Sequence, residues 1–200
     1  MAALTALLFI LMATSVRDHV QRLDEAFLRR MVSIRSSPLT WVAKVLNVLG
    51  SAAITLPARL LVAGFLALRR RWWHLAAFAS AVILAEISIG LVKHLYHRPR
   101  PPGTLVTVHG SSFPSGHAVA ASVTAVAAVI ALFPEGPRRF WWGAAAALFS
   151  FVMGLSRAYL AAHWLSDAAA GVLLGTSFAL VAAVVVHVVR EGGMSGGLTR

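Results

Sequence analysis

The sequence predicts an all-α membrane protein, a bundle of six transmembrane helices with an amphipathic helix at the membrane surface after the first span. Three observations predict this class. Hydrophobic residues make up 58% of the 200-residue chain and charged residues only 12%, against about a quarter in soluble domains. The mean hydropathy is +0.77. The apolar residues fall in runs of roughly the 20 residues that cross a bilayer as a helix, so we expect one integral-membrane domain over residues 1–200.

The apolar runs place the elements in order. Ala2 to Val16 is apolar without a cleavage pattern after it, and predicts a retained first helix rather than a signal peptide. Arg17 to Arg35 has apolar residues at helical spacing beside arginines, which is typical of a helix lying in the headgroup layer. The five further predicted spans are Leu46–Leu68, Trp72–Leu91, Ser115–Phe133, Trp141–Leu155 and Trp164–Val189. The glycine-rich tail from Glu191 is expected to be mobile.

The charges orient the bundle and limit its partners. The net charge is +11 and cysteine is absent. The arginines lie between apolar runs instead of on one face with aromatic residues, which argues against nucleic-acid binding. Membrane lipids are expected partners, a phosphate-bearing substrate would explain part of the positive charge, and protein partners are left open. Positive charge favours the cytoplasmic side, which we assign to the clusters at residues 69–71 and 138–139 and to Arg190. The six basic residues of Arg17–Lys44 count against this orientation.

Three short motifs lie at the ends of apolar runs, all on the opposite, extracytoplasmic face. They are K-x6-R-P over Lys93–Pro101, P-S-G-H over Pro114–His117, and S-R-x5-H-x3-D over Ser156–Asp167. A transferring phosphoryl group carries negative charge that cations and N–H donors must stabilise. Lys93, Arg100 and Arg157 would supply those cations.

The second and third motifs add the reacting groups. Ser115 is a natural N-cap at a helix start that attracts anions, and Gly116 lets the backbone approach a phosphate. His117 is placed to act as general acid and later as base. Asp167 lies one helical turn after His163 and is expected to accept its Nδ1–H, leaving Nε2 free to attack phosphorus. Such a covalent route needs no metal or other cofactor.

The three motifs resemble those of the type-two phosphatidic acid phosphatase superfamily of lipid phosphate phosphatases. The resemblance covers Lys93 to Asp167, with every motif position filled. It implies a six-helix membrane fold, a metal-independent phosphohistidine mechanism and the roles given above to His163, His117, Asp167, Lys93, Arg100, Ser115, Gly116 and Arg157. A short chain of this kind is similar to bacterial plasma-membrane enzymes that act on undecaprenyl diphosphate or phosphatidylglycerophosphate.

Undecaprenyl diphosphate is the expected substrate, hydrolysed to undecaprenyl phosphate and phosphate at the outer face of the membrane. The alternatives are a phosphatidylglycerophosphate or phosphatidate phosphatase of broad specificity, and a lipid phosphotransferase that uses the same site. A lipid-binding or transport protein with this fold would be expected to lack the nucleophile or the acid, and both are present.

Several residues outside the motifs also carry predictions. Arg59 and Glu86 are charges within predicted spans, and helical offsets allow them to pair and brace the helix that carries Lys93. Gly171 and Gly175 predict a close helix-packing face. Arg98 is interpreted as a solvated charge.

Overall fold

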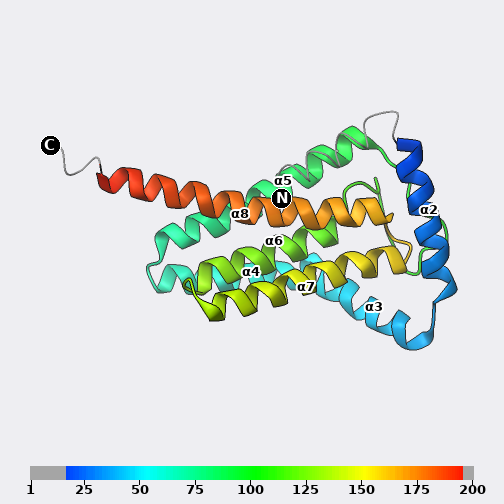
Figure 1. The fold of residues 1–200 in the computed structure, drawn as a ribbon, viewed down its shortest axis with the longest axis horizontal. Coiled ribbons are helices and arrows are strands. Elements are labelled where there is room, and N and C mark those ends of the chain that lie inside the picture. Colours follow the sequence, from blue (N-terminus) through cyan, green and yellow to red (C-terminus); the bar gives the residue numbers. More distant parts are fainter. Residues whose placement is uncertain (1–16, 196–200) are drawn as a thin grey trace.

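The structure, a computed structural model, describes residues 17–195, whose regular secondary structure is all helix (Figure 1). Its helices are α2 (Arg17–Ser33), α3 (Ser37–Leu49), α4 (Ala52–Leu68), α5 (Trp72–Tyr96), α6 (Gly116–Leu132), α7 (Pro137–Tyr159) and α8 (Leu165–Ser195). The predicted all-α class is confirmed for these residues. The predicted first span lies outside them.

Fewer helices than predicted meet the length and hydropathy of a membrane span. Among the described residues, α5 and α8 do so, and the pair α3 and α4 does so if it counts as one bent span. α6 is apolar but shorter. The count of six therefore stays a prediction. The predicted tail begins within a helix, because α8 continues to Ser195; its mobility stays a prediction.

One predicted span is broken. The run Leu46–Leu68 was expected to be continuous, but α3 ends and α4 begins around Gly50, with a bend of 49° between them. A Cβ at Gly50 would lie 2.9 Å from Sδ of Met153 and 3.2 Å from Cδ2 of His117. The bend therefore presses the end of α3 against helices α6 and α7, at a point where only glycine fits without displacing a neighbour.

The pair α6 and α8 forms the centre of the bundle. The close packing predicted at the two glycines of α8 is confirmed: a Cβ at Gly171 would lie 2.7 Å from the carbonyl oxygen of Ser115, and one at Gly175 would lie 2.6 Å from that of Val119. Larger residues would push the helices apart. The approach places the first turns of α6 and α8 side by side, and these turns carry the second motif and the end of the third.

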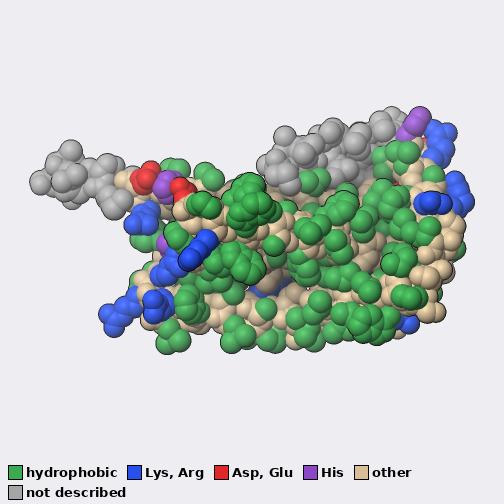
Figure 2. All heavy atoms as spheres, turned by 60° about the horizontal axis from the view of Figure 1, so that its bottom comes forward, with side chains coloured by type: hydrophobic (Ala, Val, Ile, Leu, Met, Phe, Trp, Pro, Cys, Tyr) green, Lys and Arg blue, Asp and Glu red, His purple; other side chains and the backbone are tan. Residues whose placement is uncertain are grey.

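The outer surface suits a bilayer. A core of mostly small apolar residues on α4, α5, α6 and α8 surrounds Phe78, Val119 and Val123. Large apolar side chains remain exposed outside it, such as Leu61 at 74% and Leu148 at 63%. Figure 2 shows hydrophobic side chains along the length of the bundle, with Lys and Arg mostly at its two ends. A largely apolar surface between charged ends is what a membrane protein presents to lipid.

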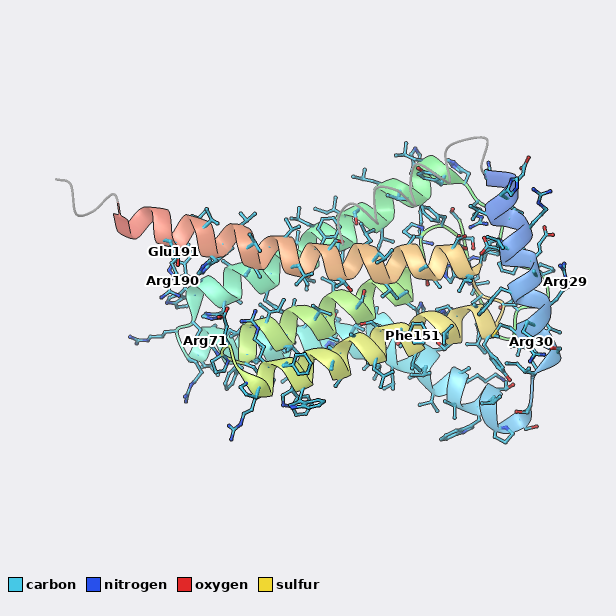
Figure 3. The ribbon with its side chains drawn as sticks, viewed as in Figure 1. Arg29, Arg30, Arg71, Phe151, Arg190 and Glu191 are labelled. Atoms are coloured by element: carbon cyan, nitrogen blue, oxygen red, sulfur yellow. The ribbon has the colours of Figure 1, made fainter. Side chains whose placement is uncertain are left out.

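α2 crosses one end of the bundle, where it packs against α7 and α8 (Figure 1). Most of its side chains are exposed, and Arg29 and Arg30 point away from the bundle (Figure 3). One carboxylate of α2, that of Asp24, is buried at 2% exposure. The predicted amphipathic helix is therefore present, and it is attached to the bundle by a charged group.

The predicted pairing of Arg59 with Glu86 is confirmed at 2.7 Å, between Nη1 and Oε1. Nε of Arg59 also donates to Oγ1 of Thr124 at 2.8 Å, so the guanidinium links α4, α5 and α6. We expect Arg59→Ala and Glu86→Ala each to cost roughly 2 kcal/mol of unfolding free energy, because each leaves a charge without its partner. The double variant should be no less stable than either single one in thermal unfolding in detergent. Additive losses would contradict a direct interaction.

Candidate active site

The three motifs meet at the end of the bundle that α2 crosses. Lys93 lies in the last turn of α5, Ser115 caps α6 and Arg157 lies in the last turn of α7. His163 is in the short loop after α7, and Asp167 is in the first turn of α8. The backbone joins the second and third motifs directly, since the amide of Ser115 donates to the carbonyl of Asp167 at 3.1 Å.

The ring of His163 is buried and held on both sides. Nδ1 lies 2.7 Å from the carbonyl oxygen of Ser112, and Nε2 lies 3.2 Å from Nη1 of Arg100. Because a carbonyl only accepts and a guanidinium only donates, these partners assign the proton to Nδ1 and the lone pair to Nε2. Burial lowers the pKa of His163 to about 4, although the nearby carboxylate of Asp167 acts in the opposite direction. A neutral imidazole whose Nε2 carries the lone pair is the form that can act as a nucleophile.

Asp167 is positioned differently from the prediction. Its Oδ2 lies 3.8 Å from Nδ1 of His163, beyond hydrogen-bond distance, and the carbonyl of Ser112 takes the expected place. Oδ2 of Asp167 accepts instead from the hydroxyl of Ser112 and from the amide of Trp164 at 2.9 Å. Ser112 thus contacts both the histidine and the aspartate. Sequence reasoning missed it, since a serine in a loop before the second motif gives no spacing signal.

Arg98 is buried, which makes its interpretation as a solvated charge wrong. It is 3% exposed, and its guanidinium forms ion pairs with Oδ1 of Asp167 at 2.5 Å and with Oδ2 of Asp24 at 2.7 Å. Its carbon Cζ also lies over the ring of Trp164, 5.6 Å from the centroid. Two buried carboxylates need a counter-ion, and Arg98 provides it for both.

Two predicted cations are held by backbone carbonyls around the histidine. Nζ of Lys93 donates to Ser111 at 2.6 Å, and the guanidinium of Arg100 donates to Ala162 at 2.7 Å and His109 at 2.7 Å, among others. Burial lowers the pKa of Arg100, and Asp167 opposes that shift. These carbonyls fix both side chains in place, and Arg100 also contacts the ring of His163.

Two further donors of the predicted phosphate site are buried without a partner. Among the described residues, Oγ of Ser115 and Nε of Arg157 have no hydrogen bond. Ser115 is the N-cap of α6, as predicted, but its side chain makes no capping bond. A Cβ at Gly116 would meet only Cγ2 of Ile89 at 4.0 Å. The protein itself therefore does not satisfy these two donors.

Asn47, at the end of α3, contacts two of the predicted site residues. Its Oδ1 accepts from Nη1 of Arg157, and its backbone forms a hydrogen bond with the ring of His117. Sequence reasoning missed this residue, although an amide side chain inside an apolar run was a signal. The bend at Gly50 explains how α3 reaches the site. Among residues 17–195, no group of three or more His, Asp or Glu side chains is arranged to hold a metal ion.

The fold and the site define a class of protein. At one end of a helical membrane bundle lie cations, two histidines and two unpaired hydrogen-bond donors. This set of groups is suited to phosphoryl transfer, as in a membrane phosphatase. Residues 72–191 match the PAP2 superfamily, and the chain belongs to that superfamily. It is a lipid phosphatase, a hydrolase of phosphoric esters.

Characterised relatives agree with this membership. Phosphatidylglycerophosphatase B of Bacillus subtilis is 28% identical over 180 residues, which cover 84% of this chain and 86% of the relative. The crystal structure of the transmembrane PAP2-type phosphatidylglycerolphosphate phosphatase from Bacillus subtilis matches with a TM-score of 0.78 at 25% identity, over 95% of this chain and 94% of that one. LpxE of Aquifex aeolicus shares the fold, with a TM-score of 0.66 at 23% identity over 80% of this chain and 94% of that one.

Proposed function

We propose that this protein is a phosphatidylglycerophosphate phosphatase, which releases the terminal phosphate of that lipid by way of a phosphohistidine. The two more similar relatives carry this activity in their names, at 28% and 25% identity. Undecaprenyl diphosphate, the substrate first expected from the sequence, has no such support and becomes the second substrate to assay. The observation that carries the proposal is the pair of buried, unpartnered donors, Oγ of Ser115 and Nε of Arg157, beside the cations and the histidine.

The proposed reaction has two steps at one phosphorus atom. Nε2 of His163 forms the P–N bond while the P–O bond to the lipid glycerol breaks, and His117 donates a proton to the departing oxygen. Water then attacks the phosphohistidine, His117 takes its proton, and the P–N bond breaks to release phosphate. Lys93, Arg100 and Arg157 stabilise the equatorial oxygens, together with Ser115 and the start of α6 at Gly116. Asp167 stabilises the positive ring of His163 in both steps. No metal takes part.

The substrate is tested by phosphate release from the detergent-purified protein. We expect release from phosphatidylglycerophosphate to exceed that from phosphatidate and undecaprenyl diphosphate, with and without a chelator. Ser115→Ala removes one unpaired donor and should lower kcat/KM roughly tenfold or more without loss of folded protein, since one charge-assisted hydrogen bond is worth about 1.5–3 kcal/mol. The control Ser80→Ala, on α5, removes a hydroxyl that bonds its own helix. Faster release from the prenyl lipid would overturn the substrate assignment, and product analysis with acceptor lipids separates hydrolysis from phosphotransfer.

The pKa of His163 predicts the acid side of the pH profile. Because that pKa is lowered to about 4, below the ordinary 6.5 of histidine, the ring stays neutral as the pH falls through 6. Protonation of His163 should therefore reduce kcat/KM only near pH 4. The second ionisation of the substrate phosphate, near pH 6, is measured by ³¹P NMR and divided out. If kcat/KM, after this correction, still falls with an apparent pKa near 6.5, the active form of His163 is not the buried ring described above.

The single-domain, extracytoplasmic arrangement is part of the proposal. The arginines at residues 138–139 and Arg190 lie at the end of the bundle away from α2, and positive charge favours the cytoplasm. The chain has no cysteine, so single cysteines report sidedness cleanly. We expect Asp18→Cys on α2 to react with a membrane-impermeant maleimide in intact cells, and Arg138→Cys to react only after lysis. The reverse pattern would place the active site on the cytoplasmic face.

A further inference from the structure

Asp24 is the one residue of α2 that is buried. It is 2% exposed, whereas Leu23 beside it is 69% exposed and Glu25 is also exposed. A carboxylate is rarely buried without specific partners, because its desolvation is costly. Asp24 also lies outside residues 72–191, the part of the chain that matches the superfamily. Its burial at the active-site end of the bundle therefore calls for an explanation that the three motifs do not give.

Asp24 is attached to the first turn of α8. Its Oδ1 accepts from the amide of Ser166 at 2.8 Å, and its Oδ2 accepts from the hydroxyl of Ser166. Amide groups at a helix start lack partners within the helix and favour a negative charge. Asp24 thus caps α8 from a different helix, at the residue immediately before Asp167.

Asp24 also shares a counter-ion with Asp167. The guanidinium of Arg98 donates to Asp24 through Nη2 at 2.7 Å and to Asp167 through Nη1 at 2.5 Å. Gln21 of α2 accepts from Nη2 at 2.8 Å, and Ser166 accepts from Nη1 at 2.7 Å. One buried positive charge is therefore divided between two buried carboxylates, in surroundings where charges are weakly screened.

We propose that Asp24 is a positioning residue of the phosphatase: acting through Arg98 and Ser166, it fixes the carboxylate of Asp167 and sets how much negative charge that carboxylate presents to His163. This inference rests on the proposed phosphohistidine mechanism. Oδ2 of Asp167 lies 3.8 Å from Nδ1 of His163, close enough to stabilise the ring as it becomes positive. Without Asp24, the positive charge of Arg98 would act on Asp167 only. The carboxylate of Asp167 would then stabilise the positive, phosphorylated ring of His163 less.

Several charged or titratable groups besides Asp167 lie near His163 and contribute to its pKa. Arg100 comes from the loop before the second motif and Arg157 from α7, and both disfavour a positive ring; His117 of α6 lies near enough to interact with it. None of these groups is replaced when Asp24 is changed. A change in the pKa of His163 in an Asp24 variant therefore measures the interaction that acts through Arg98 and Asp167.

The kinetic test compares Asp24→Asn with Asp18→Asn, which removes an equal charge from an exposed position of the same helix. We expect Asp24→Asn to lower kcat by about 10- to 100-fold, the range seen when outer partners of site ligands are removed, with KM changed less than about twofold. The acid limb of kcat/KM should move to lower pH, since a more positive surrounding disfavours protonation of His163. Asp18→Asn should match the wild type. If Asp24→Asn only reduces the fraction of enzyme that is active, and the acid limb of kcat/KM stays at the wild-type pH, the role of Asp24 is merely structural and the proposal is overturned.

A second readout does not depend on activity. In protein labelled with ¹⁵N-histidine, with His163→Gln to assign the signal, the pKa of His163 should fall in Asp24→Asn and stay unchanged in Asp18→Asn. An unchanged pKa in folded Asp24→Asn overturns the proposal. If Asp24→Asn does not fold, Asp24→Glu replaces it, since this variant keeps the charge but displaces it by one methylene. Its kcat should fall while the pKa of His163 stays unchanged. A wild-type kcat in Asp24→Glu would overturn the proposal. If the wild type releases no phosphate, the proposed function fails while the NMR comparison still decides the role of Asp24.

Discussion

Replacing His163 with alanine or glutamine is expected to lower phosphate release by roughly 10⁴-fold or more, the size of effect seen when a covalent nucleophile is removed. The structure gives the reason: Nε2 of His163 carries the lone pair and lies 3.2 Å from Arg100, a cation of the proposed phosphate site. Glutamine is the sharper variant because its amide keeps much of the volume and polarity of the ring. The measurement is release of phosphate from phosphatidylglycerophosphate by folded, detergent-purified protein.

The control for this prediction is His187→Ala. His187 is on α8 at the far end of the bundle, with a side chain 65% exposed, and its loss should leave the rate unchanged. Rapid acid-free quenching with ³²P-labelled lipid should trap a labelled protein in the wild type and none in His163→Gln. The label should survive alkali and be lost in acid, as expected of a P–N bond. A folded His163→Gln variant that keeps a tenth of the activity would refute the phosphohistidine mechanism.

The sequence predicted the elements whose signals are local. Apolar runs located α5, α6 and α8, and two glycines four residues apart predicted the face on which α8 approaches α6. The three motifs predicted which residues the structure brings together at one end of the bundle, because each motif lies at or near a helix end. Even the pairing of Arg59 with Glu86 followed from helical rise alone.

The features that the sequence did not predict depend on contacts between distant segments. An apolar run through Gly50 looks continuous, and the break appears only because α3 packs against Met153 and His117. The partners of Arg98 are 74 and 69 residues away in the chain, at Asp24 and Asp167. A charged residue near a motif is solvated in most cases, so its burial could be inferred only once α2 was placed over the site.

Replacing Arg98 with methionine is expected to destabilise the protein by about 3–5 kcal/mol, the cost of leaving buried charges unpaired. Asp24 is 2% exposed and Asp167 is fully buried, and both would lose their counter-ion at once. For a chain of this size such a loss lowers Tm by on the order of 10 °C. Thermal unfolding in detergent measures it, with Arg29→Met as the control, since Arg29 projects away from the bundle on α2 (Figure 3).

The nature of the Arg98 interaction is tested by two further variants. Arg98→Lys keeps the charge, but one ammonium group cannot donate to both carboxylates in the planar geometry of a guanidinium, so its Tm should lie between those of the wild type and Arg98→Met. Adding Asp24→Asn to Arg98→Met removes one of the two unpaired charges, so the double variant should lose less stability than the sum of the single ones. Strict additivity, or a loss in Arg98→Met no larger than in Arg29→Met, would show that the buried ion pairs do not hold α2 and α8 together.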